Sequence, residues 1–294
     1  MTETSAPVEI DDVLLRDWPL PQPGGGADKD ERGSMLVIAG SAETPGAALL
    51  AATGAMRVGA GKLAVATAAS VASGLALALP EARVLALAET FAGGPAADAL
   101  AKLETLLGRV DAILIGPGLE DAAATRAFVR RILKRETHAR IILDALAMEV
   151  VLDVRRFLRP SMMTPHHGEM AHLTGLTKEA IAADPERHAR EAATRWNAVV
   201  VLKGALTVIA APNGACWRHE SDQPGLGTSG SGDVLAGIIA GIAARGAPLV
   251  QAAAWGVALH ARAGLALSER LGPIGYLASE LPAEIPRLLQ RLAD

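Results

Sequence analysis

The segment from Gly225 to Asp233 reads Gly-Leu-Gly-Thr-Ser-Gly-Ser-Gly-Asp and leads directly into an apolar run that ends at Ala244. Glycines permit positive φ angles and let a ligand approach the backbone closely. The free N–H groups at a helix start attract anions, helped by the helix dipole, and successive N–H groups in such a loop can surround a phosphate. The segment therefore predicts a phosphate-binding loop at the start of a buried helix.

Asp233 places a carboxylate in the first turn of this predicted helix. A negative charge beside an anion site is unfavourable, unless the carboxylate takes a proton from a hydroxyl group that attacks the bound phosphate. The alternative is that Asp233 only caps the helix beside a flexible glycine turn. We treat Asp233 as a candidate general base and keep the cap as the alternative.

The composition of the 294 residues excludes several classes of protein. Half of the residues are hydrophobic but only 3% are aromatic, which is typical of helices packed on a parallel sheet of aliphatic strands. The net charge of −4 gives no electrostatic footprint for nucleic acid. The single cysteine, Cys216, excludes an intrachain disulfide and a cysteine-based metal site and suits a reducing cytoplasm.

The chain gives no sign of export or of a membrane span. Its first residues are acidic and polar, and they lack the basic and apolar regions of a secretion signal. The longest uncharged run, 63–80, contains Thr67, Ser70, Ser73 and Gly74, which favours a strand, a turn and a helix over a span. We therefore predict a cytoplasmic protein without a membrane or nucleic-acid partner.

Alternating strands and helices predict a three-layer α/β fold, with a mostly parallel central sheet and helices on both faces. Prolines and glycines make residues 1–33 a peripheral lead-in, and residues 34–294 are expected to form one domain. Asn213-Gly214 between two strand-like runs predicts an antiparallel hairpin near one edge. The expected strands are 35–39, 63–67, 83–87, 112–115, 141–143, 162–163, 199–202, 207–211 and 215–218, and the expected helices are 45–58, 96–107, 121–134, 185–197, 234–244, 248–267 and 278–292.

Five predicted strands end in clusters of Gly, Pro, Asp or Lys. In open α/β sheets, ligands bind beyond the carboxyl ends of the strands, so these clusters are expected to share one rim. They are Gly40-Ser41, Gly116-Pro-Gly118, Asp144-Ala145, Thr164-Pro-His166 and Lys203-Gly204.

Each cluster also has a plainer interpretation. Gly116-Pro-Gly118 is equally well a simple turn. His166 is a candidate ligand contact or a capping histidine, with Glu169 supporting the helix start, and a metal site is disfavoured because adjacent residues on an extended segment point apart. Lys203 is a phosphate contact or an edge lysine. The small residues of Gly46-Ala-Ala48 lie under a ligand or only permit close packing.

Together these motifs resemble, in order and over about residues 33–290, the ADP-dependent NAD(P)H-hydrate dehydratases of the ribokinase-like superfamily. The resemblance rests on Gly40-Ser41, Pro45-Gly-Ala-Ala48, Ile115-Gly-Pro-Gly118, Leu143-Asp-Ala145, Thr164-Pro-His166 with Glu169, Lys203-Gly-Ala-Leu-Thr207 and Gly230-Ser-Gly-Asp233. The chain departs from the family pattern at Asp30-Glu-Arg-Gly-Ser34, Ser229 and Gln223. The epimerase domain that is fused to some relatives is not expected here.

The resemblance implies a repair reaction, in which the S epimer of hydrated NADH or NADPH is dehydrated while ADP is converted to AMP and phosphate. It implies ADP as co-substrate, Mg²⁺ as cofactor and a homo-oligomer, with a tetramer as one candidate. Asp233 would be the catalytic base and would also contact the hydrate, with Ala47, Gly118 and His166. The implied nucleotide contacts are Lys203, Gly204, Ala205, Leu206, Thr207, Gly230, Ser231 and Gly232; no residue is assigned as a metal ligand.

Two other functions share the same loop and aspartate. An ATP-dependent ribokinase-like kinase would phosphorylate a small hydroxymethyl-bearing metabolite, whereas a nucleotide-binding regulator would perform no chemistry. Gly46-Ala-Ala48 together with Thr164-Pro-His166 favours the dehydratase over the kinase. An intact Asp233 argues against the regulator.

Overall fold

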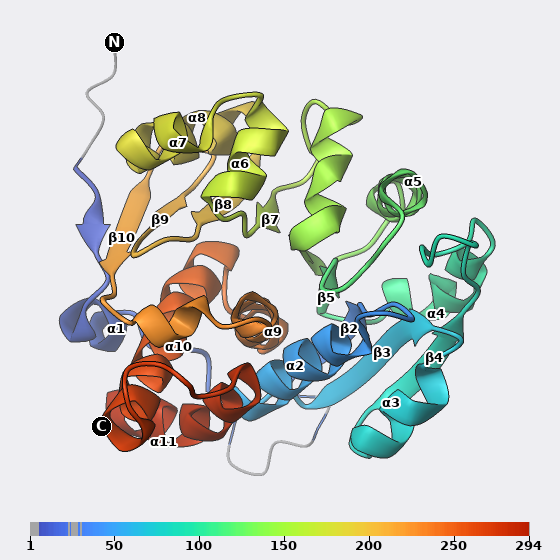
Figure 1. The fold of residues 1–294 in the computed structure, drawn as a ribbon, viewed down its shortest axis with the longest axis horizontal. Coiled ribbons are helices and arrows are strands. Elements are labelled where there is room, and N and C mark those ends of the chain that lie inside the picture. Colours follow the sequence, from blue (N-terminus) through green and yellow to red (C-terminus); the bar gives the residue numbers. More distant parts are fainter. Residues whose placement is uncertain (1–5, 23, 25–28, 30, 294) are drawn as a thin grey trace.

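A single sheet runs through the structure. The structure is a computed structural model that describes residues 6–22, 24, 29 and 31–293. Within these residues the strand order is β1-β10-β9-β8-β7-β6-β5-β2-β3-β4 (Figure 1). The strands are β1 (Val8–Glu9), β2 (Ser34–Ile38), β3 (Lys62–Ala68), β4 (Arg83–Leu87), β5 (Ala112–Ile115), β6 (Arg140–Leu143), β7 (Ser161–Met163), β8 (Ala198–Leu202), β9 (Leu206–Ala210) and β10 (Cys216–Glu220).

All neighbouring strands from β8 to β4 are parallel, whereas β9 is antiparallel to both β8 and β10. The parallel strands are almost continuously apolar because helices cover both of their faces. The predicted hairpin is confirmed: the turn between β9 and β10 closes through Ala211 and Ala215, and Gly214 takes a φ of 88°. The three-layer, mostly parallel fold predicted from the sequence is therefore confirmed.

Helices cover both faces of the sheet and divide the core into two clusters. On one face lie α2 (Pro45–Arg57), α3 (Ala72–Ala78), α9 (Ser231–Ala244), α10 (Leu249–Leu271) and α11 (Leu281–Ala293). On the other lie the short helices η1 (Ala99–Leu103) and η2 (Ala145–Leu152), with α4 (Glu104–Leu107), α5 (Ala122–Leu133), α6 (His167–Thr174), α7 (Lys178–Ala183) and α8 (Pro185–Trp196). Two further short helices complete the list: η3 (Pro224–Gly227) precedes α9, and η4 (Ala278–Glu280) precedes α11.

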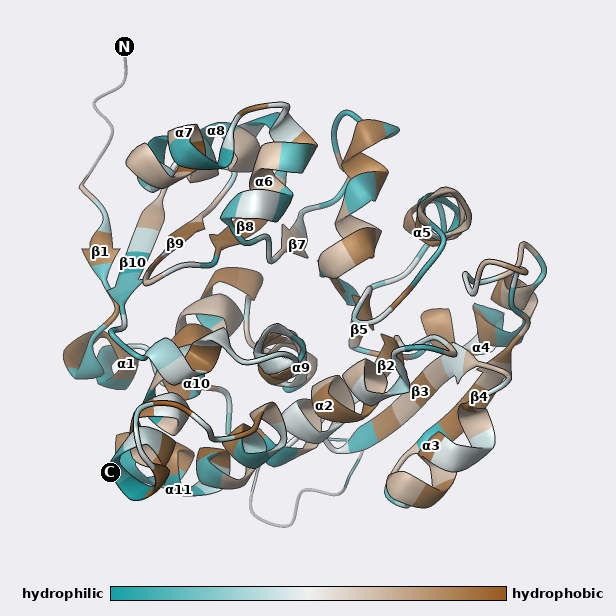
Figure 2. Cartoon of the chain, viewed as in Figure 1, coloured by the Kyte–Doolittle hydropathy of each residue, from teal (hydrophilic) through white to brown (hydrophobic). Residues whose placement is uncertain are grey.

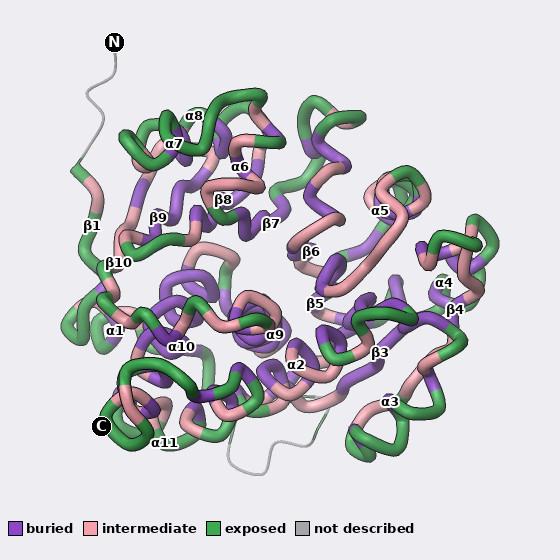
Figure 3. The backbone as a smooth tube through the Cα atoms, viewed as in Figure 1, coloured by how far each residue is buried: buried purple, intermediate pink, exposed green. Residues whose placement is uncertain are grey.

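Helix α9 is buried almost all round, since it packs between the sheet, α2 and α10. Its residues are mostly hydrophobic (Figure 2), and most of the helix is buried (Figure 3). Small residues allow this packing: a Cβ atom at Gly237 would lie 2.0 Å from the carbonyl oxygen of Ala51 in α2. The glycines of the apolar run therefore allow α9 to pack closely against α2.

The predicted helix 96–107 is different in the structure. It begins at Ala99 as a 3₁₀ turn and becomes α-helical only at Glu104. The amide of Ala96 donates to the carbonyl of Ala88, and Pro95 forms a bridge with Glu89. These contacts tie Pro95 and Ala96 to the segment that follows β4, so the helix cannot start at residue 96.

The described part of residues 1–33 adds the edge strand β1 and the helix α1 (Asp12–Asp17). Leu15 is fully buried, and the side chains of Gln251 and Trp255 donate hydrogen bonds of 2.8–3.0 Å to carbonyl groups of Trp18 and Pro19. Some residues of this lead-in lie outside the described residues, and the division at residue 33 stays a prediction. None of the helices in the described ranges combines the length and hydropathy that a bilayer span requires.

Candidate active site

The carboxyl ends of β2, β5, β6, β7 and β8 meet at one edge of the sheet, because these strands are parallel neighbours. All five clusters predicted to share a rim follow these strands, and the backbone joins several of them directly. The amide of Gly40 donates to the carbonyl of Pro117, and the amide of Lys203 donates to the carbonyl of Pro165. The sequence therefore places its motifs on a common rim as expected.

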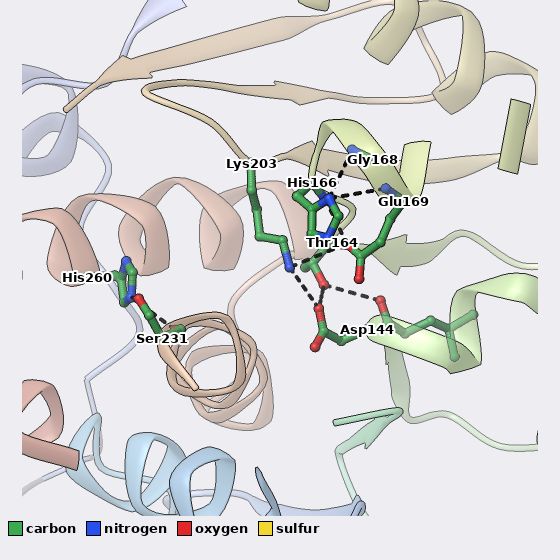
Figure 4. Close-up of polar contacts among 9 residues, drawn as sticks. Asp144, Thr164, His166, Gly168, Glu169, Lys203, Ser231 and His260 are labelled. Carbon is green, nitrogen blue, oxygen red and sulfur yellow. Dashed lines mark hydrogen bonds and ion pairs between the residues drawn. The ribbon is translucent and has the colours of Figure 1, made fainter. Parts of the chain in front are cut away.

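A buried polar cluster joins the ends of β6, β7 and β8 (Figure 4). The hydroxyl of Thr164 lies 2.6 Å from Oδ1 of Asp144, and Nζ of Lys203 lies 3.2 Å from the same oxygen. The Asp144 residue is only 2% exposed. A buried carboxylate requires a partner charge and hydrogen bonds, and Lys203 and Thr164 supply both.

Lys203 connects this cluster to the start of α9. Burial opposes its charge, but the carboxylates of Asp144 and Glu169 raise the pKa of Lys203 above its usual value. Its Nζ atom lies 3.8 Å from Oε2 of Glu169 and would lie 3.4 Å from a Cβ atom at Gly232. A permanently charged ammonium group is thus held beside the glycine loop.

His166 has a structural role at the start of α6. Its Nδ1 atom accepts hydrogen bonds of 3.0 and 3.1 Å from the amides of Gly168 and Glu169, while its own amide donates to Oε2 of Glu169 at 2.7 Å. This is a capping box with histidine as the cap. The other ring nitrogen, Nε2, lies 3.7 Å from Oε2 of Glu169, and the side chain is 58% exposed. Both interpretations of His166 therefore remain compatible with its geometry.

The glycine loop ends at Gly230, which takes a φ of 87° and precedes α9. Gly230 has no side chain to cap α9, and the amide of Ser231 donates to the carbonyl of Thr228 at 3.3 Å. The amides of Gly232 and Asp233 have no partner among the described residues and can bind an anion. A Cβ atom at Gly230 would lie 2.4 Å from Cδ1 of Leu50. Both the backbone angle and the space therefore require glycine here.

Asp233 is partly buried in the first turn of α9. Burial, followed by the charge of Asp144, raises its pKa to about 6, and Glu169 acts in the same direction while Lys203 opposes it. The Asp233 side chain makes none of the hydrogen bonds to backbone amides that define a cap of α9. The geometry therefore favours the general base over the capping alternative.

A cavity of about 560 Å³ opens beside the loop, within the size range of small-molecule sites. Its lining contains His166 and six of the eight predicted nucleotide contacts: Lys203, Gly204, Ala205, Thr207, Ser231 and Gly232. Leu206 and Gly230 are chain neighbours of these residues but do not line the cavity. Asp233, Ala47 and Gly118 also lie outside its lining.

Ala47 and Gly118 meet at another part of the rim. Gly118 takes a φ of 63°, and a Cβ atom there would lie 2.6 Å from Cβ of Ala47. The hydroxyl of Thr44 donates to the carbonyl of Gly118 at 2.8 Å and lies 2.8 Å from the hydroxyl of Ser41. The start of α2 and the turn after β5 therefore form one uncharged surface of small residues.

Sequence reasoning missed four residues of the site. Asp144 and Thr164 were recognised as strand ends but received no role, and Glu169 was considered only as a helix support. Their relation to Lys203 depends on the order β6-β7-β8, which no local pattern encodes. His260 was missed because it lies in an apolar helix; its Nε2 atom lies 2.9 Å from the hydroxyl of Ser231 (Figure 4).

Groups of three or more His, Cys, Asp and Glu side chains that could hold a metal ion do not occur within the described residues. Asp144 and Glu169 both face the ammonium group of Lys203 instead. A divalent cation here would therefore need ligands from a bound phosphate.

The fold and this rim define a class of α/β proteins that hold a phosphate on a glycine loop and place a carboxylate beside it. Residues 35–287 match the family model described as NAD(P)H-hydrate dehydratase. The chain belongs to this family.

Individual relatives agree with the family match. The chain is 48% identical over 280 residues to the ADP-dependent (S)-NAD(P)H-hydrate dehydratase of Xanthomonas campestris, and the match covers 95% of each chain. It is similar, with a TM-score of 0.85 and 31% identity, to the ADP/ATP-dependent NAD(P)H-hydrate dehydratase of Bacillus subtilis co-crystallised with ATP and Mg²⁺; that match covers 99% of this chain and all of the other.

The fold assignment has independent support. A ribokinase-like superfamily protein of Enterococcus faecalis matches with a TM-score of 0.83 and 25% identity, over 97% of this chain and 96% of that one. The ribokinase-like fold expected from the sequence is therefore confirmed.

Proposed function

We propose that this chain dehydrates the S epimer of hydrated NADH or NADPH and converts ADP to AMP and phosphate, so that it acts as a lyase in nicotinamide nucleotide repair. One observation carries the proposal most directly: a carboxylate with a raised pKa stands in the first turn of α9, near the partly buried Lys203. A kinase would also need this arrangement. The near full-length identity to a relative with the dehydratase name selects the dehydratase.

The chemical problem is that hydroxide is a poor leaving group, whereas phosphate is a good one. Asp233 takes the proton of the ring hydroxyl, and the hydroxyl oxygen attacks the β-phosphorus of ADP. The bond between the two phosphates breaks, and AMP departs with the electron pair. A base with a pKa of about 6 is well suited to this step, because it is ionised at neutral pH yet still accepts a proton readily.

The second half of the reaction eliminates the new phosphate ester. The lone pair of the ring nitrogen expels phosphate from the hydroxylated carbon, and the neighbouring carbon then loses a proton. The ring double bond returns, and the reduced nicotinamide is regenerated. The amides at the start of α9 and the ammonium group of Lys203 stabilise the negative charge that develops on the phosphate oxygens.

We assign the nucleotide to the cavity beside the glycine loop. Lys203 acts as a fixed positive charge, Gly204 to Thr207 line one wall, and Gly230 to Gly232 present backbone amides. The size of the cavity and the charge of Lys203 support this placement. Leu206 and Gly230 act through their backbone positions next to lining residues.

We assign the hydrate to the rim formed by Ala47, Gly118 and His166. The absence of large side chains at Ala47 and Gly118 leaves room for a flat ring, and Nε2 of His166 is available to donate a hydrogen bond. Asp233 lies on α9, which packs against α2, so it reaches the border between this surface and the nucleotide cavity.

Mg²⁺ fits this site as an ion carried by the nucleotide. It commonly binds through one or two carboxylates together with substrate phosphates, and Asp222 is a carboxylate residue that lines the cavity. The ion would neutralise phosphate charge. The described residues supply too few ligands for a metal site built from protein alone.

Cytoplasmic action and a homo-oligomer, with a tetramer as one candidate, complete the proposal. The lone, buried thiol of Cys216 suits a reducing compartment. Light scattering of the purified chain, measured during size-exclusion chromatography, tests the oligomer: a mass of one protomer would contradict it.

The function is tested with hydrated NADH of resolved stereochemistry. The near-ultraviolet absorbance of the reduced nicotinamide should return when the S epimer is mixed with the chain, Mg²⁺ and ADP, and one phosphate should appear for each NADH. The R epimer should not react. Turnover of ATP with a hydroxymethyl metabolite, without recovery of absorbance, would contradict the proposal and identify a kinase, while tight nucleotide binding without any turnover would identify a regulator.

A further inference from the structure

His260 occupies an unusual place for a titratable side chain. It lies on α10 inside a long apolar helix, is 8% exposed, and lines the cavity beside the glycine loop. Its Nε2 atom lies 2.9 Å from the hydroxyl oxygen of Ser231 and 3.1 Å from the carbonyl oxygen of the same residue. One ring nitrogen therefore faces two oxygens of the first residue of α9.

We propose that His260 is a positioning residue: its Nε2–H group holds the hydroxyl oxygen of Ser231, so that Ser231 donates its own proton to a phosphate oxygen of the nucleotide. The inference rests on the proposed function, because it assumes that the nucleotide occupies this cavity. The other contacts proposed between the glycine loop and the nucleotide come from backbone amides. The inference adds a side-chain donor, Ser231, and the residue that orients it, His260.

The direction of the hydrogen bonds follows from what each atom can do. A backbone carbonyl oxygen only accepts, so the contact with the carbonyl oxygen of Ser231 requires a proton on Nε2. Burial lowers the pKa of His260 to about 4, and the imidazole is neutral at pH 7. A neutral ring with its proton on Nε2 cannot accept there. The hydroxyl oxygen of Ser231 must therefore be the acceptor.

This arrangement leaves the hydroxyl proton of Ser231 without a partner among the described residues. Ser231 is 4% exposed, and both it and Gly232 line the cavity. A buried donor without an acceptor is unfavourable, and an anionic oxygen in the cavity would satisfy it. The amides at the start of α9 attract an anion to the same place.

The inference is tested by the affinity for ADP in the presence of Mg²⁺, measured by titration calorimetry. Ser231→Ala and His260→Leu should each weaken binding about tenfold, the size expected for a hydrogen bond to a charged group. The double variant should be no weaker than either single variant, because both changes remove the same interaction. His260→Gln, which retains an amide donor, should recover most of the affinity.

Gln251→Leu provides a matched control on the same helix. Gln251 is also buried and also donates from a side-chain nitrogen to backbone carbonyl groups, but it contacts Trp18 and Pro19. This variant should lower thermal stability and leave the affinity for ADP unchanged. A purely structural role for His260 would make its variants behave in the same way.

Several outcomes would overturn the inference. Normal ADP affinity in Ser231→Ala or His260→Leu would do so, as would independent, additive losses in the double variant. If His260→Leu does not fold, Ser231→Ala and His260→Gln still decide. Nitrogen NMR of the ring should show the proton on Nε2, and a proton on Nδ1 would contradict the proposed direction. Failure of the unmodified chain to bind ADP would instead contradict the proposed function.

Discussion

The two halves of the rim differ in their residues: one half is charged, and the other consists of small uncharged residues. At the ends of β6, β7 and β8, charged side chains meet: Nζ of Lys203 lies 3.2 Å from Asp144 and 3.8 Å from Glu169. At the ends of β2 and β5, Ala47 and Gly118 form a surface without charged side chains. In the proposed function, the ammonium group of the first half faces a phosphate, and the second half leaves room for the hydrated ring. The proposed base, Asp233, lies in the first turn of α9, which contacts β2, β5 and β6.

The largest expected effect is that of Asp233→Asn, which removes the base at the border of the two halves. Turnover should fall by about 10²–10⁴-fold, the usual contribution of a general base. ADP binding should survive, because Asn retains the shape of the side chain. Initial rates and ADP calorimetry check the two expectations, and a nearly normal rate would show that Asp233 is not the catalytic base.

The pH dependence of catalysis gives the next largest effect. The pKa of Asp233 is raised to about 6, and only the deprotonated form accepts a proton. Consequently kcat/KM for the hydrate should be steady above this value and fall about tenfold for each pH unit below it. Stopped assays between pH 4 and 8, at pH values where the fold is intact by circular dichroism, measure the profile. A fall only near pH 4 would mean that neither burial nor the neighbouring carboxylates raise the pKa of Asp233.

Lys203→Ala tests the charged half alone. ADP at a hundredfold excess over its Kd stabilises the folded chain by about 2.7 kcal/mol if it binds only the folded state. A tenfold loss of affinity would remove about 1.4 kcal/mol of this stabilisation. ADP should therefore still raise the melting temperature of the variant, but by less. Arg195→Ala, an exposed change on α8, should keep the full shift. A full shift in Lys203→Ala would make Lys203 only a partner for Asp144.

His166 gives the smallest expected effect and separates its two interpretations. His166→Ala removes the cap of α6 and should lower stability by about 1 kcal/mol. His166→Asn keeps a capping oxygen, so its stability should stay near normal while KM for the hydrate rises severalfold and KM for ADP changes little. Normal kinetics in His166→Asn would show that His166 is only a cap.

Much of the fold could be predicted because its information is local. The strands are short apolar runs that end in glycine, proline or charged residues, and β4 and β5 match the predicted ranges at both ends. The two-residue strand β1 has no periodicity to detect. Helix α1 and its buried Leu15 were hidden in a segment interpreted as peripheral because of its prolines and glycines.

Candidate site residues could be predicted where a local motif or a strand end pointed to one kind of chemistry. The glycine loop, Lys203 and Asp233 came from motifs and strand ends. The contact between Asp144 and Lys203 could not be predicted from the sequence. The two residues are 59 positions apart, and only the order of the strands brings them together. The same holds for His260, whose contact with Ser231 depends on the packing of α10 against α9.

We propose that the charged half of the rim binds ADP and that the half formed by small residues binds the hydrate. The Michaelis constants for both substrates, measured in two variants, test this division most directly. Gly118→Ala adds a methyl group 2.6 Å from Cβ of Ala47 and forces a left-handed alanine, which costs about 1–2 kcal/mol. Measured side by side, Gly118→Ala should raise KM for the hydrate and spare ADP, whereas Lys203→Ala should raise KM for ADP and spare the hydrate. Equal changes in both constants for both variants would contradict the division.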